Sequence, residues 1–210
     1  MRRWGRTLCG GAVALLVAGA AVAAAAAWGF DKDPTGKIAP GWTEVAGAWQ
    51  VVKDATAPSR PNVLAQVSRT HTGERFNVAV VREFRSADVD ISVAFKAVSG
   101  REDEGGGPVW RYRDVKNYYV ARFNPLEDNF RVYKVVNGRR LQLGSANVKL
   151  PAKRWHRLRV TMAGSRIRCF LNGKQYLDVK DETFKSAGQI GLWTKADAVT
   201  YFDDLKATGK

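Results

Sequence analysis

The final quarter of the chain alternates apolar and polar residues in short segments separated by turn sequences, and this period of two constrains the fold more than any other feature. The segment WHRLRVTM (155–162) places its leucine, valine and methionine on one face and its arginines on the other, as expected when one side of a sheet is buried. The segment RIRCFLN (166–172) alternates in the same way, and Asn172-Gly173 is a strong hairpin signal. Three antiparallel strands are predicted here.

The N-terminus carries three arginines followed by an apolar run. MRRWGRT precedes a stretch from Leu8 to Ala27 that is rich in Leu, Val and Ala and offers several A-x-A sites. This pattern is typical of a secretory signal peptide over residues 1–27, cleaved near Ala25 to Ala27. The run is also about long enough to span a bilayer, so an uncleaved membrane anchor stays as the alternative. Either interpretation predicts a periplasmic or secreted location.

The chain is strongly basic, with a formal net charge of +14, or +11 without the three arginines of the signal segment. This charge favours anionic envelope components as partners. The basic side chains are spread through the predicted strands and no recognition helix is expected, so no nucleic-acid partner is predicted. Cys169 is the one cysteine after the signal segment. Its strand phase indicates a small core residue, not a reactive thiol.

One folded domain is expected. Residues 28–40 include the polar, Pro- and Gly-marked DKDPTGKIAP and are predicted to form a linker. Residues 41–210 are enough for one domain and contain roughly eleven to thirteen short strand patterns separated by turns, without a long segment of period 3.6. Because two sheets must cover each other's apolar faces, the predicted fold class is all-β, a two-sheet antiparallel jelly-roll β-sandwich.

Several motifs resemble those of the concanavalin A-like lectin and glucanase sandwiches. They run from GWTEVAGAWQV through VWRYRDVKNYYVAR and WHRLRV to GQIGLWTKADAVTYFDDL. The pattern is similar in particular to the exported bacterial DUF1080, or 3-keto-disaccharide hydrolase, domains, over residues 41–209. This resemblance implies a concanavalin A-like jelly roll with carbohydrate as the ligand on its concave face. If the chain is an enzyme, the resemblance implies a glycoside hydrolase or a 3-keto-glycoside lyase.

Strand phase identifies a candidate ligand-binding face. In YYVARFN (118–124), Tyr119, Ala121 and Phe123 make the better core face, which leaves the other residues on a polar face. Arg, Asn and Tyr suit sugars because hydroxyls need convergent donors and acceptors, while pyranose rings stack on aromatic rings. A solvated outer sheet face is the alternative, and Trp193 is also compatible with the core. The candidate ligand-binding residues are Arg111, Arg113, Tyr118, Arg122, Asn124, Arg131, Tyr133 and Trp193.

Catalytic carboxylates do not form a recognisable motif. Glycosidases of the usual kind need two carboxyl groups roughly 5 to 10 Å apart, and the glucanases of this fold keep theirs in an E-x-D-x-x-E pattern that this chain lacks. Glu102, Asp103 and Glu104 lie in a glycine-rich loop, where we expect them to be solvated. Glu83 and Asp114 are the remaining catalytic candidates.

The resemblance also implies a structural calcium ion, because sandwiches of this class often bind one near the last strand. Asp203 and Asp204 are the candidate ligands, with a plain surface position as the alternative; no other cofactor is predicted. Three functions stay open: an exported, lectin-like carbohydrate-binding domain, a keto-glycoside lyase or hydrolase, and a structural or adhesion domain without a small ligand.

Overall fold

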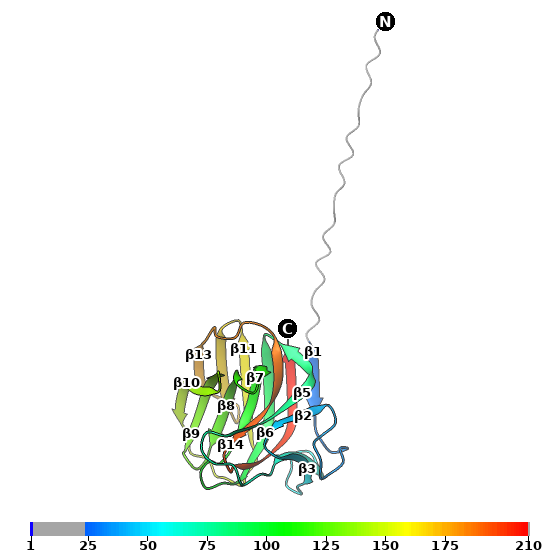
Figure 1. Ribbon diagram of the computed structural model, residues 1–210, viewed down its shortest axis with the longest axis vertical. Helices are drawn as coiled ribbons and strands as arrows, with labels where there is room; N and C mark the ends of the chain where they lie inside the picture. The colour runs from blue at the N-terminus through cyan, green and yellow to red at the C-terminus, as the bar shows by residue number, and fades with distance from the viewer. Residues whose placement is uncertain (2–23, 210) are drawn as a thin grey trace.

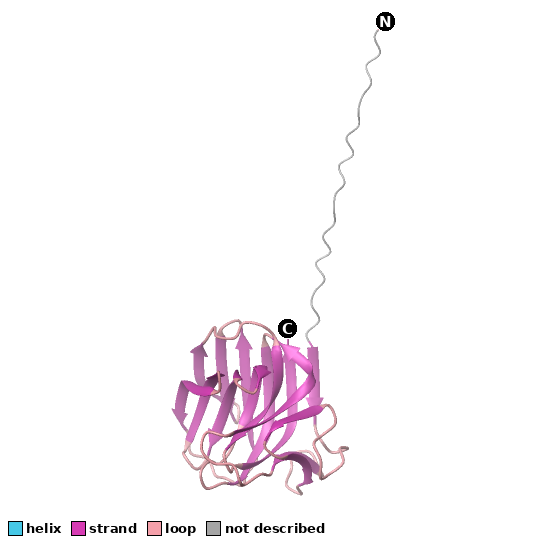
Figure 2. Cartoon of the chain, viewed as in Figure 1, coloured by secondary structure: helices cyan, strands magenta, loops and turns pink. Residues whose placement is uncertain are grey.

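The computed structural model describes residue 1 and residues 24–209, and the described chain folds into two antiparallel β-sheets packed face to face (Figures 1 and 2). The eight-stranded sheet has the order β13 (Lys174–Lys180), β12 (Arg166–Leu171), β11 (His156–Ala163), β6 (Val89–Ser99), β15 (Val199–Gly209), β4 (Asn62–Gln66) and β3 (Trp49–Lys53), with β1 (Ala24–Trp28) also paired to β15. The seven-stranded sheet has the order β10 (Arg139–Asn147), β9 (Asn129–Val136), β8 (Asn117–Asn124), β7 (Gly107–Asp114), β14 (Gly188–Lys195), β5 (Phe76–Ser86) and β2 (Trp42–Ala46). The predicted all-β antiparallel sandwich is confirmed.

The C-terminal strands pair as their sequence pattern predicts. In the β11–β12 pair, Val160 lies opposite Cys169, and both are fully buried. The following turn has φ values of 49° at Asn172 and 83° at Gly173, the left-handed backbone that makes Asn-Gly a favoured hairpin turn. The full burial of Cys169 confirms its expected place as a core residue, and it raises the pKa of the thiol.

The main core fills the space between the sheets. The seven-stranded sheet contributes Trp110, Tyr119 and Phe123, and the eight-stranded sheet contributes Phe95 and Phe202. All five side chains are fully buried. The rings of Phe95 and Phe123 meet across the interface with centroids 6.1 Å apart. These contacts join the sheets by the interdigitation typical of β-sandwiches.

Residues 28–40 pack as part of the domain instead of forming the predicted linker. Phe30 is 4% exposed and Ala39 is 1% exposed, and both belong to the main core. Trp28 packs edge-to-face on Trp42 and Phe84. The linker prediction is wrong because it rests on the polar composition of the segment, whereas a few apolar residues within it pack into the sandwich.

The N-terminal predictions are covered only in part by the described residues. Ala24–Trp28 form β1, and this strand pairs with Leu205 to Gly209 of β15. Most of the predicted signal segment, residues 2–23, lies outside the described residues. None of the described residues belong to a helix long and apolar enough to cross a membrane.

The loop between β13 and β14 closes one end of the sandwich. Asp181 is its anchor: its carboxylate accepts hydrogen bonds from the Tyr119 hydroxyl at 2.6 Å and from Lys134 Nζ at 2.7 Å. Phe184 then packs edge-to-face on the Tyr119 ring, with centroids 5.1 Å apart. Burial alone would raise the pKa of Asp181, but the bonds from Lys134, Tyr119 and Thr183 lower it to about 2.

The buried position of Phe30 predicts a stability loss on truncation. Phe30→Ala should lower the free energy of unfolding by about 3 kcal/mol, because the lost apolar contacts leave a cavity. Leu141→Ala is the control: its side chain is 41% exposed, and such a surface change should cost about 0.5 kcal/mol or less. Urea denaturation followed by tryptophan fluorescence measures both values. Equal losses in the two variants would show that residues 28–40 do not pack on the domain.

The anchoring of Asp181 predicts an acid-sensitive stability. Its folded-state pKa of about 2 lies below its ordinary value of 3.8, so its contribution is fully present above pH 3.8 and is lost as the pH falls through about 2. Asp181→Asn should therefore reduce the fall in unfolding free energy between about pH 4 and pH 2. Urea titrations across that range measure the slope, with Glu83→Gln as control. A slope identical to that of the wild type would contradict this assignment.

Candidate functional site

Strand β8 alternates as its sequence predicts and defines two sides of the seven-stranded sheet. Its core side carries Tyr119, Ala121 and Phe123. Its opposite side, which we call the outer face, carries Tyr118, Val120, Arg122 and Asn124. Across the β8–β9 pair, Arg122 lies opposite Arg131 and Val120 lies opposite Tyr133, so Arg131 and Tyr133 share the outer face, since directly paired residues point to the same side.

Strand β7 loses its alternation at a β-bulge, and the predicted positions of Arg111 and Arg113 on the outer face are therefore wrong. The register shifts between Trp110 and Asp114, and Arg111 has a φ of 46°. After the bulge Tyr112 joins the outer-face cluster. The Arg113 guanidinium lies 5.0 Å from the centroid of the Phe184 ring, on the other side. An extra residue in one strand reverses the side to which later residues point.

Gly188 on the adjacent strand β14 permits this bulge. A Cβ at Gly188 would lie 2.4 Å from the carbonyl carbon of Arg111 and 2.7 Å from the backbone nitrogen of Tyr112. A side chain at this position would therefore collide with the bulged backbone. The bulge depends on a glycine far away in the sequence, which alternation within β7 cannot reveal.

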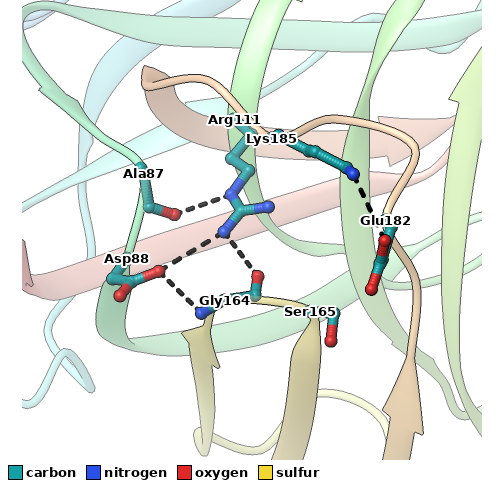
Figure 3. A pocket seen from close by; sticks show the side chains of 7 residues that line it. All are labelled: Ala87, Asp88, Arg111, Gly164, Ser165, Glu182 and Lys185. Atoms are coloured by element: carbon teal, nitrogen blue, oxygen red, sulfur yellow. Dashed lines mark hydrogen bonds and ion pairs between the residues drawn. The ribbon is translucent and has the colours of Figure 1, made fainter.

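The Arg111 side chain forms hydrogen bonds to three loops at one end of the sandwich (Figure 3): those between β5 and β6, between β11 and β12, and between β13 and β14. Its Nε donates to the Ala87 carbonyl at 2.6 Å, and one Nη donates to the Gly164 carbonyl at 2.7 Å. The other Nη donates to the Phe184 carbonyl. The Nη that bonds Gly164 also lies 3.4 Å from Asp88 Oδ1, the one carboxylate that pairs with Arg111 among the described residues. The side chain is 3% exposed, and burial lowers its pKa.

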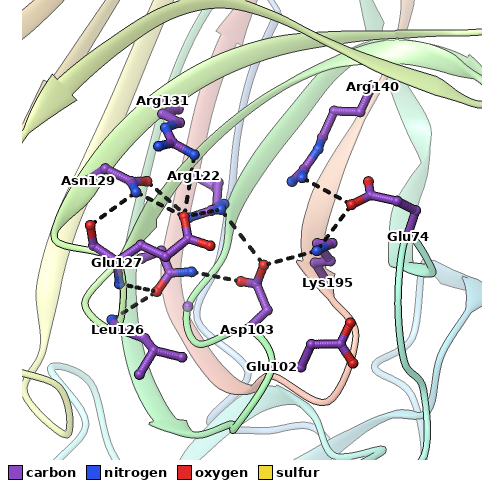
Figure 4. A network of polar contacts seen from close by, with 12 residues as sticks. Glu74, Glu102, Asp103, Arg122, Leu126, Glu127, Asn129, Arg131, Arg140 and Lys195 are labelled. Atoms are coloured by element: carbon purple, nitrogen blue, oxygen red, sulfur yellow. Dashed lines mark hydrogen bonds and ion pairs between the residues drawn. The ribbon is translucent and has the colours of Figure 1, made fainter.

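The outer face carries a buried charge network centred on Arg122 (Figure 4). Arg122 is 1% exposed and donates to Asn129 Oδ1 at 3.1 Å and to Glu127 Oε2 at 3.0 Å. Its guanidinium also lies 3.7 Å from Asp103 Oδ2. Asn124 donates to Asp103 Oδ1 at 3.0 Å. These groups come from β8, from the turn after it, from the first residue of β9 and from the loop before β7.

Asp103 is fully buried, so the expectation that this acidic loop side chain is solvated is wrong. Asp197 accepts hydrogen bonds from the backbone nitrogens of Arg101, Glu102 and Asp103, which folds the loop over the sheet. Burial raises the pKa of the Asp103 carboxyl, against the opposing charges of Arg122 and Lys195. A carboxyl group with a raised pKa beside two cations is a candidate for proton transfer.

Glu127 differs from Asp103 in its electrostatics. Burial acts to raise its pKa, but the hydrogen bond from Asn129 and the charge of Arg122 outweigh burial and lower it. Arg131 Nη adds an ion pair with Glu127 at 3.3 Å. Glu127 is 38% exposed and Arg131 is 32% exposed. Glu127 and Arg131 therefore form the solvent-exposed rim of the network, where their opposite charges balance each other.

Aromatic rings lie beside the charges on the outer face. Trp193 is fully buried and donates from Nε1 to the Tyr118 hydroxyl at 3.2 Å. The Arg140 guanidinium covers these rings, 4.7 Å from the Tyr133 centroid and 5.8 Å from that of Trp193. Burial raises the pKa of Tyr118. Trp193 thus lies on the outer face, which is one of the two positions predicted for it; the other is the core.

A third acidic residue, Glu74, links the aromatic part of the face to Arg122 through Lys195 and Asp103. Glu74 Oε1 pairs with Arg140 at 3.5 Å and with Lys195 Nζ at 3.2 Å. Lys195 Nζ lies 3.8 Å from Asp103 Oδ2. Cations and carboxylates therefore alternate across the face from Arg140 to Arg131.

The outer face also concentrates polar atoms that lack hydrogen-bond partners. Six buried side-chain nitrogen or oxygen atoms among the described residues have none, and four of these belong to this face: Asp103 Oδ2, Arg122 Nε, Tyr133 Oη and Arg140 Nη1. Buried polar atoms are nearly always paired in native proteins. A cluster of unpaired donors and acceptors therefore marks this face as the candidate functional site.

The structure brings together six of the predicted ligand-binding residues, all on the outer face: Tyr118, Arg122, Asn124, Arg131, Tyr133 and Trp193. Strand phase alone misses Asp103, Glu74 and Arg140. Lys195 could have been found, because it follows Trp193 by two residues on β14 and shares its face.

The catalytic candidates Glu83 and Asp114 lie outside this network. Glu83 is exposed on β5. Asp114 is exposed and accepts hydrogen bonds from the Lys116 backbone and from Asn117 Nδ2, at the turn between β7 and β8. Neither carboxylate contacts Asp103 or Glu127.

Asp203 and Asp204 do not converge on a shared cation site. Asp203 accepts hydrogen bonds from Ser59 N at 2.9 Å and from Ser59 Oγ at 3.0 Å, and burial raises its pKa. Asp204 pairs with Arg157 at 3.3 Å. Among the described residues, no group of three or more His, Cys, Asp or Glu side chains could hold a metal ion. The calcium prediction stays untested and gains no support from the donors at this position.

Solved structures with a similar fold include carbohydrate-binding domains. The carbohydrate-binding module CBM66 from Bacillus subtilis is 20% identical, with a TM-score of 0.65 over 82% of this chain and 97% of that one. Domain 4 of AbnA, an extracellular GH43 arabinanase from Geobacillus stearothermophilus solved with arabinotriose, is 11% identical, with a TM-score of 0.58 over 88% and 91%. A Bacillus subtilis protein with a galectin-like fold is 13% identical, with a TM-score of 0.59 over 80% and 90%.

These three identities are low, so the likeness shows a common fold. No curated protein sequence matches the chain. A family model does match: the 3-keto-alpha-glucoside-1,2-lyase-like domain aligns with residues 30–208, which include all the strands from β2 to β14 and nearly all of β15. The chain therefore belongs to the family of 3-keto-alpha-glucoside-1,2-lyase-like domains.

Proposed function

We propose that this protein is an exported carbohydrate-binding domain that holds glycans on the outer face of its seven-stranded sheet. The observation that carries the proposal is the cluster of four buried polar atoms around Arg122 and Arg140 that have no hydrogen-bond partner among the described residues. Sugar hydroxyls both donate and accept hydrogen bonds, so they complement a carboxylate oxygen, guanidinium N–H groups and a phenol that make no hydrogen bond. The CBM66 module and the arabinotriose-bound domain, which share the fold, support this ligand class.

The rim of the face supplies the entry to these groups. Glu74 is 65% exposed, and its pairs with Arg140 and Lys195 are longer than 3 Å. Arg140 and Lys195 are 14% and 12% exposed, so a saccharide that displaces Glu74 must offer oxygen acceptors to both cations. Arg140 then moves from its place over Tyr133 and Trp193, and a sugar ring stacks on these aromatic side chains. Glu127 and Arg131, both partly exposed, bind the hydroxyls of the same ligand.

The proposed function includes export of the domain to the periplasm or the exterior. The basic N-terminal segment followed by an apolar run supports delivery to the periplasm or the exterior, where glycans are available. The strongly basic composition, +14 for the whole chain, supports additional weak attraction to anionic envelope components. These contacts retain the domain near its ligand.

Arg122→Lys tests the binding face. Lysine keeps the positive charge but lacks the planar guanidinium, which donates to Asn129 and to Glu127 at the same time. We expect the affinity for a saccharide found on a glycan array of glucosides, fructans and arabinans to fall about tenfold or more. Calorimetric titration measures the loss. Arg113→Ala is the matched control, because Arg113 lies on the other side of β7 and should bind as the wild type does.

Two outcomes would count against this assignment. One is the absence of any saccharide-dependent binding by the folded wild-type domain. The other is an Arg122→Lys variant that binds as tightly as Arg113→Ala. The first outcome would favour the third possibility, an adhesion domain without a small ligand, and the second would place the saccharide site away from Arg122.

The geometry of Asp103 supports a second candidate function, a keto-glycoside lyase. In a 3-keto-glucoside the hydrogen on C2 is acidic because it lies beside the carbonyl. A base that removes this proton allows the C1–O bond to break, with a C1–C2 double bond formed and the departing oxygen taking up a proton. Asp103 combines burial and a raised pKa with two nearby cations, Arg122 and Lys195. The cations stabilise the oxyanion that develops on the carbonyl oxygen.

Incubation with 3-keto-sucrose and 3-keto-trehalose tests this second function. We expect elimination products by NMR, with a rate that rises with pH through the raised pKa of Asp103. Asp103→Asn should lower the rate at least 100-fold, whereas Glu83→Gln should leave it unchanged. Intact substrate after prolonged incubation with the wild type, or an Asp103→Asn variant as active as the wild type, would exclude Asp103 as the base.

A further inference from the structure

A pocket lies at the end of the sandwich where Arg111 bonds three loops (Figure 3). It has a volume of about 270 Å³ and is lined by Ala87, Asp88, Arg111, Gly164, Ser165, Glu182 and Lys185. None of these residues takes part in the charge network on the outer face. The bulge in β7 separates the two places, because it turns Arg111 away from the side occupied by Arg122.

The lining of this pocket selects for a polar and uncharged ligand. No large apolar side chain is present. Its two cations, Arg111 and Lys185, are balanced by the carboxylates of Asp88 and Glu182. Lys185 and Glu182 pair with each other at 3.3 Å and are 74% and 67% exposed. Because the lining has no net charge, it offers no particular attraction to a simple anion or cation.

Hydrogen-bonding capacity remains at the floor of the pocket. Asp88 Oδ1 accepts from the Gly164 backbone nitrogen at 2.8 Å and from Arg111 at 3.4 Å. Within the part of the chain that the structure describes, Asp88 Oδ2 and Ser165 Oγ make no hydrogen bond. The Asp88 side chain is 43% exposed, so its free oxygen is accessible to a ligand.

We propose that this end pocket is a second saccharide site, which takes one sugar residue at the end of a glycan. Adjacent hydroxyls of the sugar donate to Asp88 Oδ2 and exchange hydrogen bonds with Ser165 Oγ, while Lys185 leaves Glu182 to bind an oxygen at the rim. The volume lies near the lower limit for ligand pockets, about 300 Å³, so a single ring is accommodated. Arg111, almost fully buried and held by carbonyls on three sides, keeps Asp88 and Gly164 in position.

The site binds independently of the proposed function of the outer face, and residue-resolved NMR distinguishes the two. Amide signals of Asp88, Gly164 and Ser165 report the end pocket, and those of Arg122 and Lys195 report the outer face. D-glucose, D-galactose and D-fructose are titrated separately into the labelled domain. At least one sugar should shift the end-pocket signals with saturation, in the wild type and equally in Arg122→Lys.

Substitutions at the floor complete the test. Asp88→Asn keeps an acceptor for the Gly164 nitrogen but replaces the free carboxylate oxygen with a donor, and Ser165→Ala removes the hydroxyl. Each should weaken end-pocket binding about tenfold. Asp90→Asn is the matched control, since Asp90 pairs with Arg159 outside the pocket, and it should bind as the wild type does. The unbound spectra show whether each variant is folded.

Two results would overturn the second site. The first is that none of the three sugars shifts these signals in the folded wild type, whether or not glycine, a small zwitterion, shifts them. The second is that the saturable shifts survive in the double variant Asp88→Asn, Ser165→Ala.

Discussion

The contact between Arg122 and Asp103 organises the outer face of the seven-stranded sheet. Both side chains are buried, and a buried charge that loses its partner costs several kcal/mol. The loop before β7 must therefore stay folded over β8, and Asp197 holds it there through three backbone nitrogens. The turn after β8 is fixed in the same way, because Glu127 and Asn129 supply the remaining acceptors of Arg122. One ion pair thus positions two connections and the groups that face a ligand.

The seven-stranded sheet is covered on both sides, and this explains why its aromatic residues divide between two clusters. Trp110 and Tyr119 stack in the main core with centroids 5.6 Å apart. Tyr112 and Tyr118 stack on the outer face at 5.7 Å. The bulge of β7 makes this division possible, since it lets Trp110 point inward and Tyr112 point outward with only Arg111 between them. Arg111 is then directed to the end of the sandwich, where it anchors three connections.

Sequence alternation predicts a residue's side only where the pairing is regular. The assignments of Tyr118, Arg122 and Asn124 to the outer face follow from the period of β8, which pairs with β9 without a register shift. Alternation does not predict the sides of Arg111 and Arg113, because these depend on a bulge and on Gly188 of β14, which is adjacent to β7 in the sheet but distant in the sequence. Alternation does not predict the burial of Asp103 either, because this burial results from contacts with Asn124 and Arg122. Such contacts between distant segments have no counterpart in a local pattern of polarity.

The ion pairs of the outer face differ in how readily a ligand can break them, and exposure decides the order. Arg122 and Asp103 are at most 1% exposed, so their separation would leave buried charges without compensation. Glu74 is 65% exposed, so water readily solvates its carboxylate when it leaves its partners. A saccharide that enters this face therefore displaces Glu74 first and meets Arg122 and Asp103 in the arrangement that the fold imposes. Because these two groups are already in place, little of the binding free energy is spent on ordering them.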